Sequence, residues 1–144
     1  MGYTHSWSFF GELPEKAWAQ VIEDAKTIVK VAGIPLIGKG GCNAPPVPVI
    51  DVDKGIYLNG DVENGDEFED FDFNNRDNSN WCKTGRRPYD LVVTAILLRA
   101  WMILGPFIHI SSDGEWDEWM PARDLVGKQW PEEEITRPMS SNDE

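Results

Sequence analysis

The strongest candidate for binding chemistry is a basic segment that stands directly before an apolar stretch. Its three cationic side chains lie within five positions, at Lys83, Arg86 and Arg87. Arginine presents a rigid fork that matches the oxygens of phosphate or carboxylate, and lysine adds a mobile point charge. The apolar stretch is typical of a helix, whose first backbone N–H groups lack partners and favour an anion. The segment therefore predicts a site for a small anionic group.

Two residues beside the cations are assigned to the same ligand site, Thr84 and Tyr89, with the tyrosine ring meeting an apolar part of the ligand. Asp90 falls in or near the first helical turn and balances part of the positive charge. The alternative is that Arg86 and Arg87 pair with the acidic residues 61–72 and hold the fold together. The residues alone leave both interpretations open.

A second polar segment, residues 111–119, is the candidate for the other half of the site. A strand that runs into Ser-Ser-Asp-Gly places Ser112 and Asp113 at its carboxyl end, where open sheets commonly bind ligands. Trp116 could stack on a base or a sugar. The alternative is a turn that caps a helix while Trp116 and Trp119 close the core.

The two histidines, His5 and His109, are both expected on strands. We include His5 in the candidate ligand site, and the alternative for either residue is a hydrogen-bonded histidine in the core or at a sheet edge. No nucleophile–base pair, metal-binding cluster or cofactor motif stands out in the sequence, so we expect no catalytic residue, no metal and no cofactor. Binding is therefore favoured over catalysis, and a hydrolase that uses Asp113, His5 or His109 is a second alternative.

A run of acidic side chains between residues 61 and 72 contains seven acids and no base. Such a run is usually a solvated face. It could also imitate the phosphate spacing of a nucleic acid and occupy the basic groove of a host protein. The acids that would contact such a partner are Asp61, Glu63, Asp66, Glu67, Glu69, Asp70 and Asp72.

The elements that must position these residues follow from hydrophobic periodicity. Alternating aromatic residues predict a first strand, and apolar residues at helical spacing predict two long helices. The resulting fold is a single α+β domain over residues 1–130, a small and mostly antiparallel sheet packed against two long helices, followed by an acidic, flexible tail over 131–144. The predicted elements are strands at 3–10, 47–52, 55–59, 68–73 and 107–110, helices at 14–32 and 88–104, a broken third helix at 115–126, a loop at 34–48 and a mobile polar insertion at 74–80.

Composition fits one folded domain. The chain has 144 residues, 41% hydrophobic content and a formal net charge of -12. The negative charge argues against direct nucleic-acid binding and against an anionic membrane surface. No signal peptide is recognised, so the expected location is cytoplasmic. Cys42 and Cys82 are too few for a disulfide framework, and Cys82 is expected to be buried. The oligomeric state is left open, a homo-oligomer included.

Four blocks together resemble a family of small uncharacterised proteins from bacteriophages and bacterial genomes. The blocks are Gly-Tyr-Thr-His-Ser-Trp at 2–7, Leu-Asn-Gly at 58–60, Cys-Lys-Thr-Gly-Arg-Arg-Pro-Tyr-Asp at 82–90 and Ser-Ser-Asp-Gly-Glu-Trp-Asp-Glu-Trp at 111–119. Residues 61–80 fit the pattern least. The resemblance implies a phage or prophage setting, a location in the host cytoplasm and a role in counter-defence.

The leading hypothesis is a phage-type accessory protein that captures a small anionic or nucleotide-like ligand at the basic segment. The alternative is an acidic inhibitor that mimics nucleic acid and blocks a host nucleic-acid-binding complex, for example of CRISPR type. The partner is then a basic host protein instead of a small ligand. The place of Arg86 and Arg87, facing a ligand pocket or facing the acids of 61–72, separates the two interpretations of the basic segment.

Overall fold

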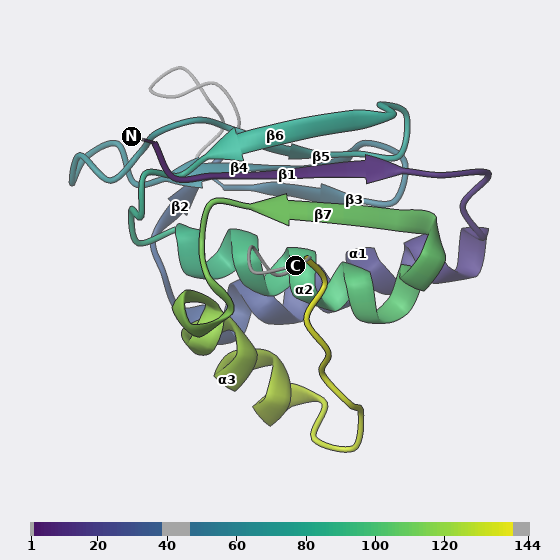
Figure 1. Cartoon of the computed structure of the whole chain (residues 1–144). Coiled ribbons are helices and arrows are strands. Elements are labelled where there is room, and N and C mark those ends of the chain that lie inside the picture. Colours follow the sequence, from purple (N-terminus) through teal and green to yellow (C-terminus); the bar gives the residue numbers. More distant parts are fainter. Residues whose placement is uncertain (1, 39–46, 140–144) are drawn as a thin grey trace.

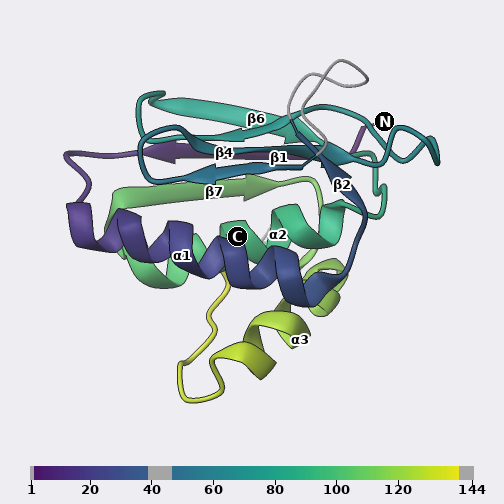
Figure 2. The same cartoon turned by 180° about the vertical axis from the view of Figure 1, so that it is seen from behind.

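The protein is described here by a computed structural model that covers residues 2–38 and 47–139. The strands form one layer, α1 and α2 pack beneath it, and α3 lies beyond α2 (Figures 1 and 2). The strands are β1 Thr4–Phe9, β2 Leu36–Ile37, β3 Val49–Asp51, β4 Gly55–Gly60, β5 Phe71–Phe73, β6 Ser79–Lys83 and β7 Ile108–Ser112. The helices are α1 Glu15–Ala32, α2 Asp90–Leu104 and α3 Met120–Gln129, with 3₁₀ turns η2 Gly105–Phe107 and η3 Trp116–Trp119.

The sheet that builds the site has the strand order β6-β1-β7, and both pairings are antiparallel. In the central strand, His5 lies opposite Cys82 on one side and opposite Ser112 on the other. This register places the start of β1 between the end of β6 and the end of β7. The basic segment and the Ser-Ser-Asp-Gly turn are therefore neighbours across one strand, although 27 positions separate Thr84 from Ser111 in the sequence.

The expected single sheet is instead two antiparallel sheets, so the α+β class is confirmed and the sheet arrangement is corrected. The second sheet has the order β2-β4-β3, and β5 pairs with β4. Where the sheets meet, side-chain bonds stand beside a single recorded backbone bond, from the Glu69 N–H to the Lys83 carbonyl at 3.2 Å. The Asn80 amide donates to the Asp72 carbonyl at 3.2 Å, and the Lys83 N–H donates to the Glu69 carboxylate at 2.8 Å. Such side-chain bonds interrupt a regular ladder, which explains the split.

Among the described residues there are three α-helices, so the two long helices of the expected fold are joined by the shorter α3. Pro14 precedes α1, and Gly33 ends it with φ +65°, the left-handed conformation in which helices commonly end. Helix α2 is buried on most sides and is the central core helix, as expected from its composition. Pro121 lies at the start of α3, so the predicted third helix divides into η3 and α3.

The aromatic residues that predicted β1 and β5 form a cluster between the strands and α1. Trp7 contacts Phe71 and Phe73 with ring centroids 5.3 and 5.4 Å apart, and Trp18 of α1 stacks on Phe73 at 5.7 Å. Offset and edge-to-face pairs of this kind add to the stability that apolar burial supplies. The cluster fixes β1 against α1 and thereby fixes the strand that carries Tyr3 and His5.

The polar insertion predicted at 74–80 is wrong in part, because Ser79 and Asn80 belong to β6 and the turn before them is tied down. Asn74 is 4% exposed, and its side-chain oxygen accepts the backbone N–H groups of Arg76 and Asp77. Arg76 donates to the backbone of Asp53 and Lys54 across the β3–β4 turn. Asparagine holds such turns through its own backbone contacts, a feature that hydrophobic periodicity does not register.

Residues 131–139, placed by the sequence in a flexible tail, lie against the domain. Glu133 forms an ion pair with Arg99 of α2 at 2.8 Å, Thr136 accepts the Trp101 indole N–H at 3.1 Å, and Met139 is buried. Arg99 also lies 4.1 Å from the ring centroid of Trp130 and pairs with the buried Asp24 at 2.8 Å. Residues 140–144 of the predicted tail, and residues 39–46 of the predicted loop, lie outside the described residues.

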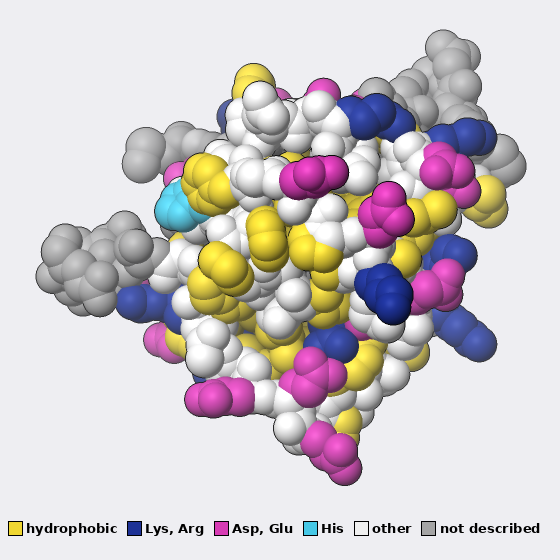
Figure 3. Space-filling model, turned by 90° about the vertical axis from the view of Figure 1, so that its right-hand side faces the viewer, with side chains coloured by type: hydrophobic (Ala, Val, Ile, Leu, Met, Phe, Trp, Pro, Cys, Tyr) yellow, Lys and Arg dark blue, Asp and Glu magenta, His cyan; other side chains and the backbone are white. Residues whose placement is uncertain are grey.

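The surface seen from the β1–α1 connection mixes apolar and charged side chains (Figure 3). On this face the acidic side chains are scattered, with no continuous negative patch.

Candidate functional site

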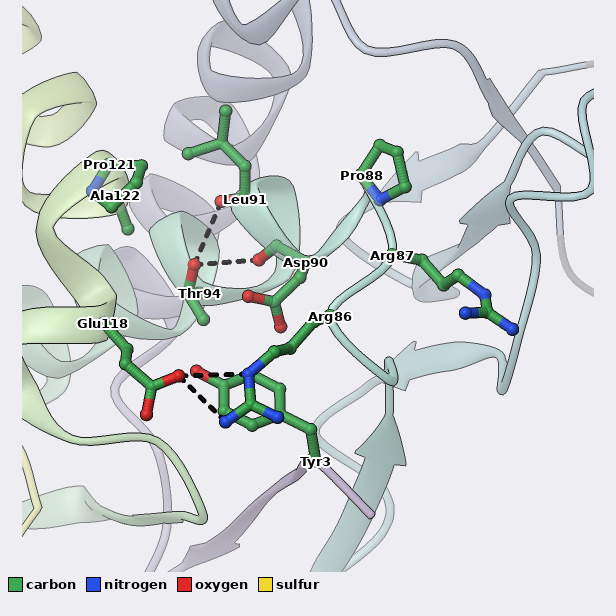
Figure 4. Close-up of a pocket in the computed structure, with 10 residues that line it drawn as sticks. All are labelled: Tyr3, Arg86, Arg87, Pro88, Asp90, Leu91, Thr94, Glu118, Pro121 and Ala122. Atoms are coloured by element: carbon green, nitrogen blue, oxygen red, sulfur yellow. Dashed lines mark hydrogen bonds and ion pairs between the residues drawn. The ribbon is translucent and has the colours of Figure 1, made fainter. Parts of the chain in front are cut away.

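A cavity of about 290 Å³ opens between the basic segment, the first turns of α2 and the start of α3 (Figure 4). The register of β1 brings Tyr3 to its floor, and η3 contributes Glu118. The lining residues are Tyr3, Arg86, Arg87, Pro88, Asp90, Leu91, Thr94, Glu118, Pro121 and Ala122. The cavity thus joins the two segments that the sequence singled out.

Arg86 is the cation that lies inside this site. Its guanidinium stands 4.0 Å from the centroid of the Tyr3 ring and donates from Nε and Nη2 to one oxygen of Glu118, at 3.1 and 2.9 Å. The side chains of this ion pair are 59% and 37% exposed. Exposed pairs contribute about 0–1 kcal/mol, so a ligand anion can replace Glu118 at little cost.

The backbone at Arg86 is strained. Gly85 and Arg86 have φ +58° and +59°, and the Arg87 N–H donates to the Thr84 carbonyl at 3.0 Å, which are the features of a type I′ turn. Arg86 is the only residue other than glycine with positive φ in the described part of the chain. A side chain in this region costs about 1–2 kcal/mol, and such outliers cluster at functional sites.

The other two cations of the basic segment are directed elsewhere. Arg87 and Lys83 both approach the ring of Phe68, at 5.3 and 5.6 Å from its centroid. Figure 4 shows the Arg87 side chain pointing away from Arg86 and Tyr3. The three cations therefore do not converge on one ligand. Neither arginine has a recorded ion pair with the acids of 61–72 within the described ranges, so Arg86 meets a carboxylate that the sequence did not identify.

The beginning of α2 does not offer free N–H groups to an anion. The backbone N–H groups of Asp90, Leu91 and Val92 donate to the carbonyls of the residues three positions earlier, at 2.8, 3.3 and 3.0 Å. This tight turn satisfies the donors that the sequence argument left without partners. An anion in the cavity is held by side chains and not by the helix terminus.

A buried chain of hydrogen bonds lies behind the cavity wall. The Asp90 Oδ1 atom lies 2.7 Å from His5 Nε2 and accepts the Thr84 hydroxyl at 2.6 Å. On its other side, His5 Nδ1 lies 2.8 Å from Ser112 Oγ. His5 and Thr84 are fully buried, so they position Asp90 and do not reach the cavity themselves.

The order serine–histidine–aspartate resembles a hydrolase triad, but hydrogen-bond accounting favours a structural role. Ser112 Oγ accepts the Gly114 N–H at 2.9 Å and the Trp119 indole N–H at 3.3 Å. These two bonds occupy both lone pairs, so the Ser112 hydroxyl donates to His5 Nδ1 and His5 Nε2–H donates to Asp90. A nucleophile needs a free lone pair, and Ser112 has none.

The residues named for a hydrolase are not brought together. His5 faces the core, while His109 is exposed on the opposite face of β7 and contacts Ser111 at 3.4 Å. The Asp113 carboxylate accepts the backbone N–H of Thr4 at 3.0 Å. Asp113 therefore closes the β1–β7 end of the sheet and stands outside the cavity lining.

Two further residues of the predicted site stabilise its surroundings. Tyr89 is fully buried, and its hydroxyl donates to the Glu69 carbonyl at 2.6 Å. Trp116 lies 4.3 Å beneath the Arg123 guanidinium and packs beside Trp119. Cys82 is buried next to Tyr89, as expected, and burial raises the pKa of its thiol to about 12. This thiol is therefore protonated and unreactive at neutral pH.

The acidic run is a folded connection between β4 and β5. Asp61 accepts the Glu63 N–H and the Asn64 amide, at 3.1 and 2.7 Å, and Asp70 accepts the Asn59 amide at 2.9 Å. Several of its carboxylates therefore hold the local backbone. The inhibitor role that the sequence assigned to this run stays a prediction.

Sequence reasoning missed the importance of Glu118 and undervalued Tyr3 and Asp90. One local signal existed for Glu118, because Glu115 and Glu118 have the spacing of a capping box, and both of its bonds are present at the start of η3. The capping box fixes Glu118 where it meets Arg86. Tyr3 and Asp90 could be placed only through the strand register.

Other kinds of site find little support. Within residues 2–38 and 47–139, no group of three or more histidine, cysteine, aspartate or glutamate side chains could hold a metal ion. The segment Asp90–Phe107 is long and apolar enough to cross a membrane by length and composition, and 56% of it is buried inside the domain. A core helix passes the same criteria.

No protein-family model matches this chain, and neither a curated protein nor a solved structure matches it. The resemblance to phage and bacterial proteins therefore stays a prediction. The function must be argued from the geometry of the cavity.

Proposed function

We propose that this protein is a phage-type accessory protein that acts by binding, and that Arg86 takes an anionic group of a small ligand. The proposal rests on the backbone conformation and the contacts of Arg86 at the cavity mouth. Its backbone is held in the left-handed region, and its guanidinium lies over the Tyr3 ring with Nη1 free of any recorded partner in the described chain. A strained, stacked arginine beside a cavity is preorganised for a planar anion.

Glu118 supports this assignment because it occupies the position that a ligand carboxylate or phosphate would take. Arg86 donates two bonds to a single Glu118 oxygen, an arrangement that an incoming anion can replace with a two-oxygen contact. The carboxylate of Glu118 keeps a second role after displacement, since its other oxygen accepts the Glu115 N–H at 3.3 Å. The Glu118 carboxylate therefore takes the place that the anionic group of the ligand would occupy.

Binding is favoured over catalysis by the same geometry. In the buried serine–histidine–aspartate chain, the serine has no free lone pair to act as a nucleophile. A counter-defence role in the host cytoplasm follows from the family resemblance and is part of the proposal. It would work by sequestering a small anionic or nucleotide-like molecule.

The test is calorimetric titration of the wild-type protein with AMP, inorganic phosphate and isocaproate, with Arg86→Gln and Arg87→Gln as matched variants. Both substitutions remove one exposed positive charge at the cavity lining, but the Arg87 guanidinium is directed to Phe68, away from Arg86 and Tyr3. We expect Arg86→Gln to weaken binding by about tenfold to a hundredfold, as for a lost hydrogen bond to a charged group, and Arg87→Gln to change it little. Equal losses in both variants, or no binding to wild type at millimolar concentration, would contradict the proposal.

A further inference from the structure

Three polar groups at the cavity have no hydrogen-bond partner among the described residues. They are Nη1 of Arg86, the hydroxyl of Tyr3 and Oδ2 of Asp90. Tyr3 lines the cavity and is 2% exposed, and its hydroxyl has no recorded bond in the described part of the chain. A polar group at a cavity that bonds to no protein group is available to a ligand. The cavity thus presents two donors and one acceptor to a ligand.

Tyr3 remains a donor at any physiological pH. Burial and the neighbouring Asp90 and Glu118 carboxylates raise the pKa of its hydroxyl far above the ordinary value, while Arg86 lowers it only in part. A protonated phenol beside a guanidinium can share the oxygens of one bound anionic group. Arg86 and Tyr3, already stacked, therefore form the anion-binding side of the cavity.

The charge balance of the cavity argues against a ligand that is only an anion. Its lining includes Arg86 and Arg87 together with the carboxylates of Asp90 and Glu118, but the Arg87 guanidinium is directed to Phe68, away from Arg86. Arg86 is therefore the cation that lies beside the two carboxylates. A lone phosphate or carboxylate on Arg86 would face these like charges at short range. An ammonium group on the same ligand would instead meet the free oxygen of Asp90.

Size and lining restrict the ligand further. A volume of about 290 Å³ is at the lower end of ligand pockets, which span roughly 300–1,000 Å³. Leu91, Pro121 and Ala122 form an apolar wall beside the polar groups. The space suits a compact molecule with a short apolar body.

We infer that the ligand is a small zwitterion of the amino-acid type, with its anionic group on Arg86 and Tyr3 and its ammonium group on Asp90. This inference rests on the proposed function, because it adds an ammonium group to the anion that Arg86 binds. His5 and Thr84 are positioning residues in this site. Both donate to Oδ1 of Asp90 and leave Oδ2 directed to the ligand.

The test compares L-leucine with two matched fragments, isocaproate, which lacks the amine, and isoamylamine, which lacks the carboxylate. Affinities are measured by NMR titration of the full-length protein. Two substitutions dissect the site. Tyr3→Phe removes a hydroxyl with no internal bond, so it leaves stability unchanged and weakens leucine binding by about threefold to tenfold. Asp90→Asn keeps an oxygen for His5 and Thr84 and should bring leucine down to the affinity of isocaproate.

The expected result is that isocaproate binds at millimolar concentration and that leucine binds about tenfold or more tightly than either fragment. If isocaproate or AMP binds through Arg86 as tightly as leucine does, the inference of a zwitterionic ligand is wrong and the proposed function stands. Binding of isoamylamine alone, or of none of the probes, would overturn both. An unchanged leucine affinity in Tyr3→Phe also contradicts the inference, and this variant decides the matter if Asp90→Asn fails to fold.

Discussion

Replacing Ser112 by alanine tests the buried network that holds Asp90 at the cavity. The hydroxyl serves three partners at once, namely the Gly114 N–H, the Trp119 indole N–H and Nδ1 of His5. His5 and Trp119 are fully buried and Gly114 is buried, so water does not readily replace the lost bonds. Because each unsatisfied buried group costs about 1–3 kcal/mol and costs within one network do not simply add, we expect a loss of about 2–4 kcal/mol.

Ser111→Ala is the matched control, because alternate residues of β7 face opposite sides of the sheet. Ser111 is exposed and makes one long contact to His109 at 3.4 Å. Its substitution should change stability by no more than about 0.5 kcal/mol. For a domain of this length the Ser112→Ala loss corresponds to a Tm lowered by roughly 6–12 °C, measured by calorimetry or circular dichroism.

The same network fixes the tautomer of His5, which gives a second measurement on the wild-type protein. Long-range ¹H–¹⁵N correlation spectra should show a proton on Nε2 and none on Nδ1. The Ser112 hydroxyl is assigned as the hydrogen-bond donor to His5 Nδ1. Equal stabilities of the Ser111→Ala and Ser112→Ala variants, or a proton on Nδ1 of His5, would refute this assignment. Either result would return Ser112 to consideration as a nucleophile.

The remaining predictions concern the strained turn and the ion pair at the carboxyl end. Arg86→Gly should be more stable than Arg86→Ala by about 1 kcal/mol in urea unfolding, because glycine adopts φ +59° without steric cost. Equal stabilities would contradict the left-handed backbone. Hydrogen bonds from Arg99 hold the pKa of Glu133 below its ordinary value of 4.5. Its stabilising contribution is therefore complete above that value and disappears as pH falls through the lower folded pKa, so wild type should lose more Tm than Glu133→Gln between pH ~6 and ~3.

The parts of the fold that the sequence predicted are those determined by local pattern. The alternating aromatics of β1, the helical spacing in α1 and the apolar composition of α2 each specify a periodicity and a buried face without reference to the rest of the chain. Gly33 and Pro14 mark the ends of α1 for equally local reasons. These elements could be predicted because the conformation of each is determined by its own local sequence.

The missed features depend on pairing between distant segments. Strand β6 was hidden because Ser79 and Asn80 read as loop residues, and only pairing with β1 makes them a strand. The partner of Arg86 could not be predicted either. Glu118 is 32 positions away, and several acids nearer in sequence competed for the same arginine. The hydrophobic pattern does not show which acidic residue pairs with Arg86, because that contact depends on the strand register and on one capping box.

The register also explains why the site lies at this end of the sheet. The Tyr3 carbonyl accepts the backbone N–H groups of Thr84 and Gly85, at 3.1 and 3.3 Å. The Thr4 carbonyl accepts the N–H of Asp113 at 2.9 Å. The start of β1 thus fixes both the basic turn and the Ser-Ser-Asp-Gly turn. The two members of the ion pair at the cavity come from these two segments, Arg86 from the first turn and Glu118 from the element after the second. The amino-terminal strand is therefore the scaffold that brings the opposite charges together.

The net charge of -12 gives this arrangement a consequence for ligand choice. A ligand with net negative charge must approach against the field of the whole protein, and the cations near the cavity oppose that repulsion only locally. A neutral zwitterion meets no such long-range penalty and still places its anionic group on Arg86. The net negative charge that disfavours nucleic acids therefore also disfavours anionic small ligands relative to neutral ones. Local geometry and overall charge favour the same chemical class.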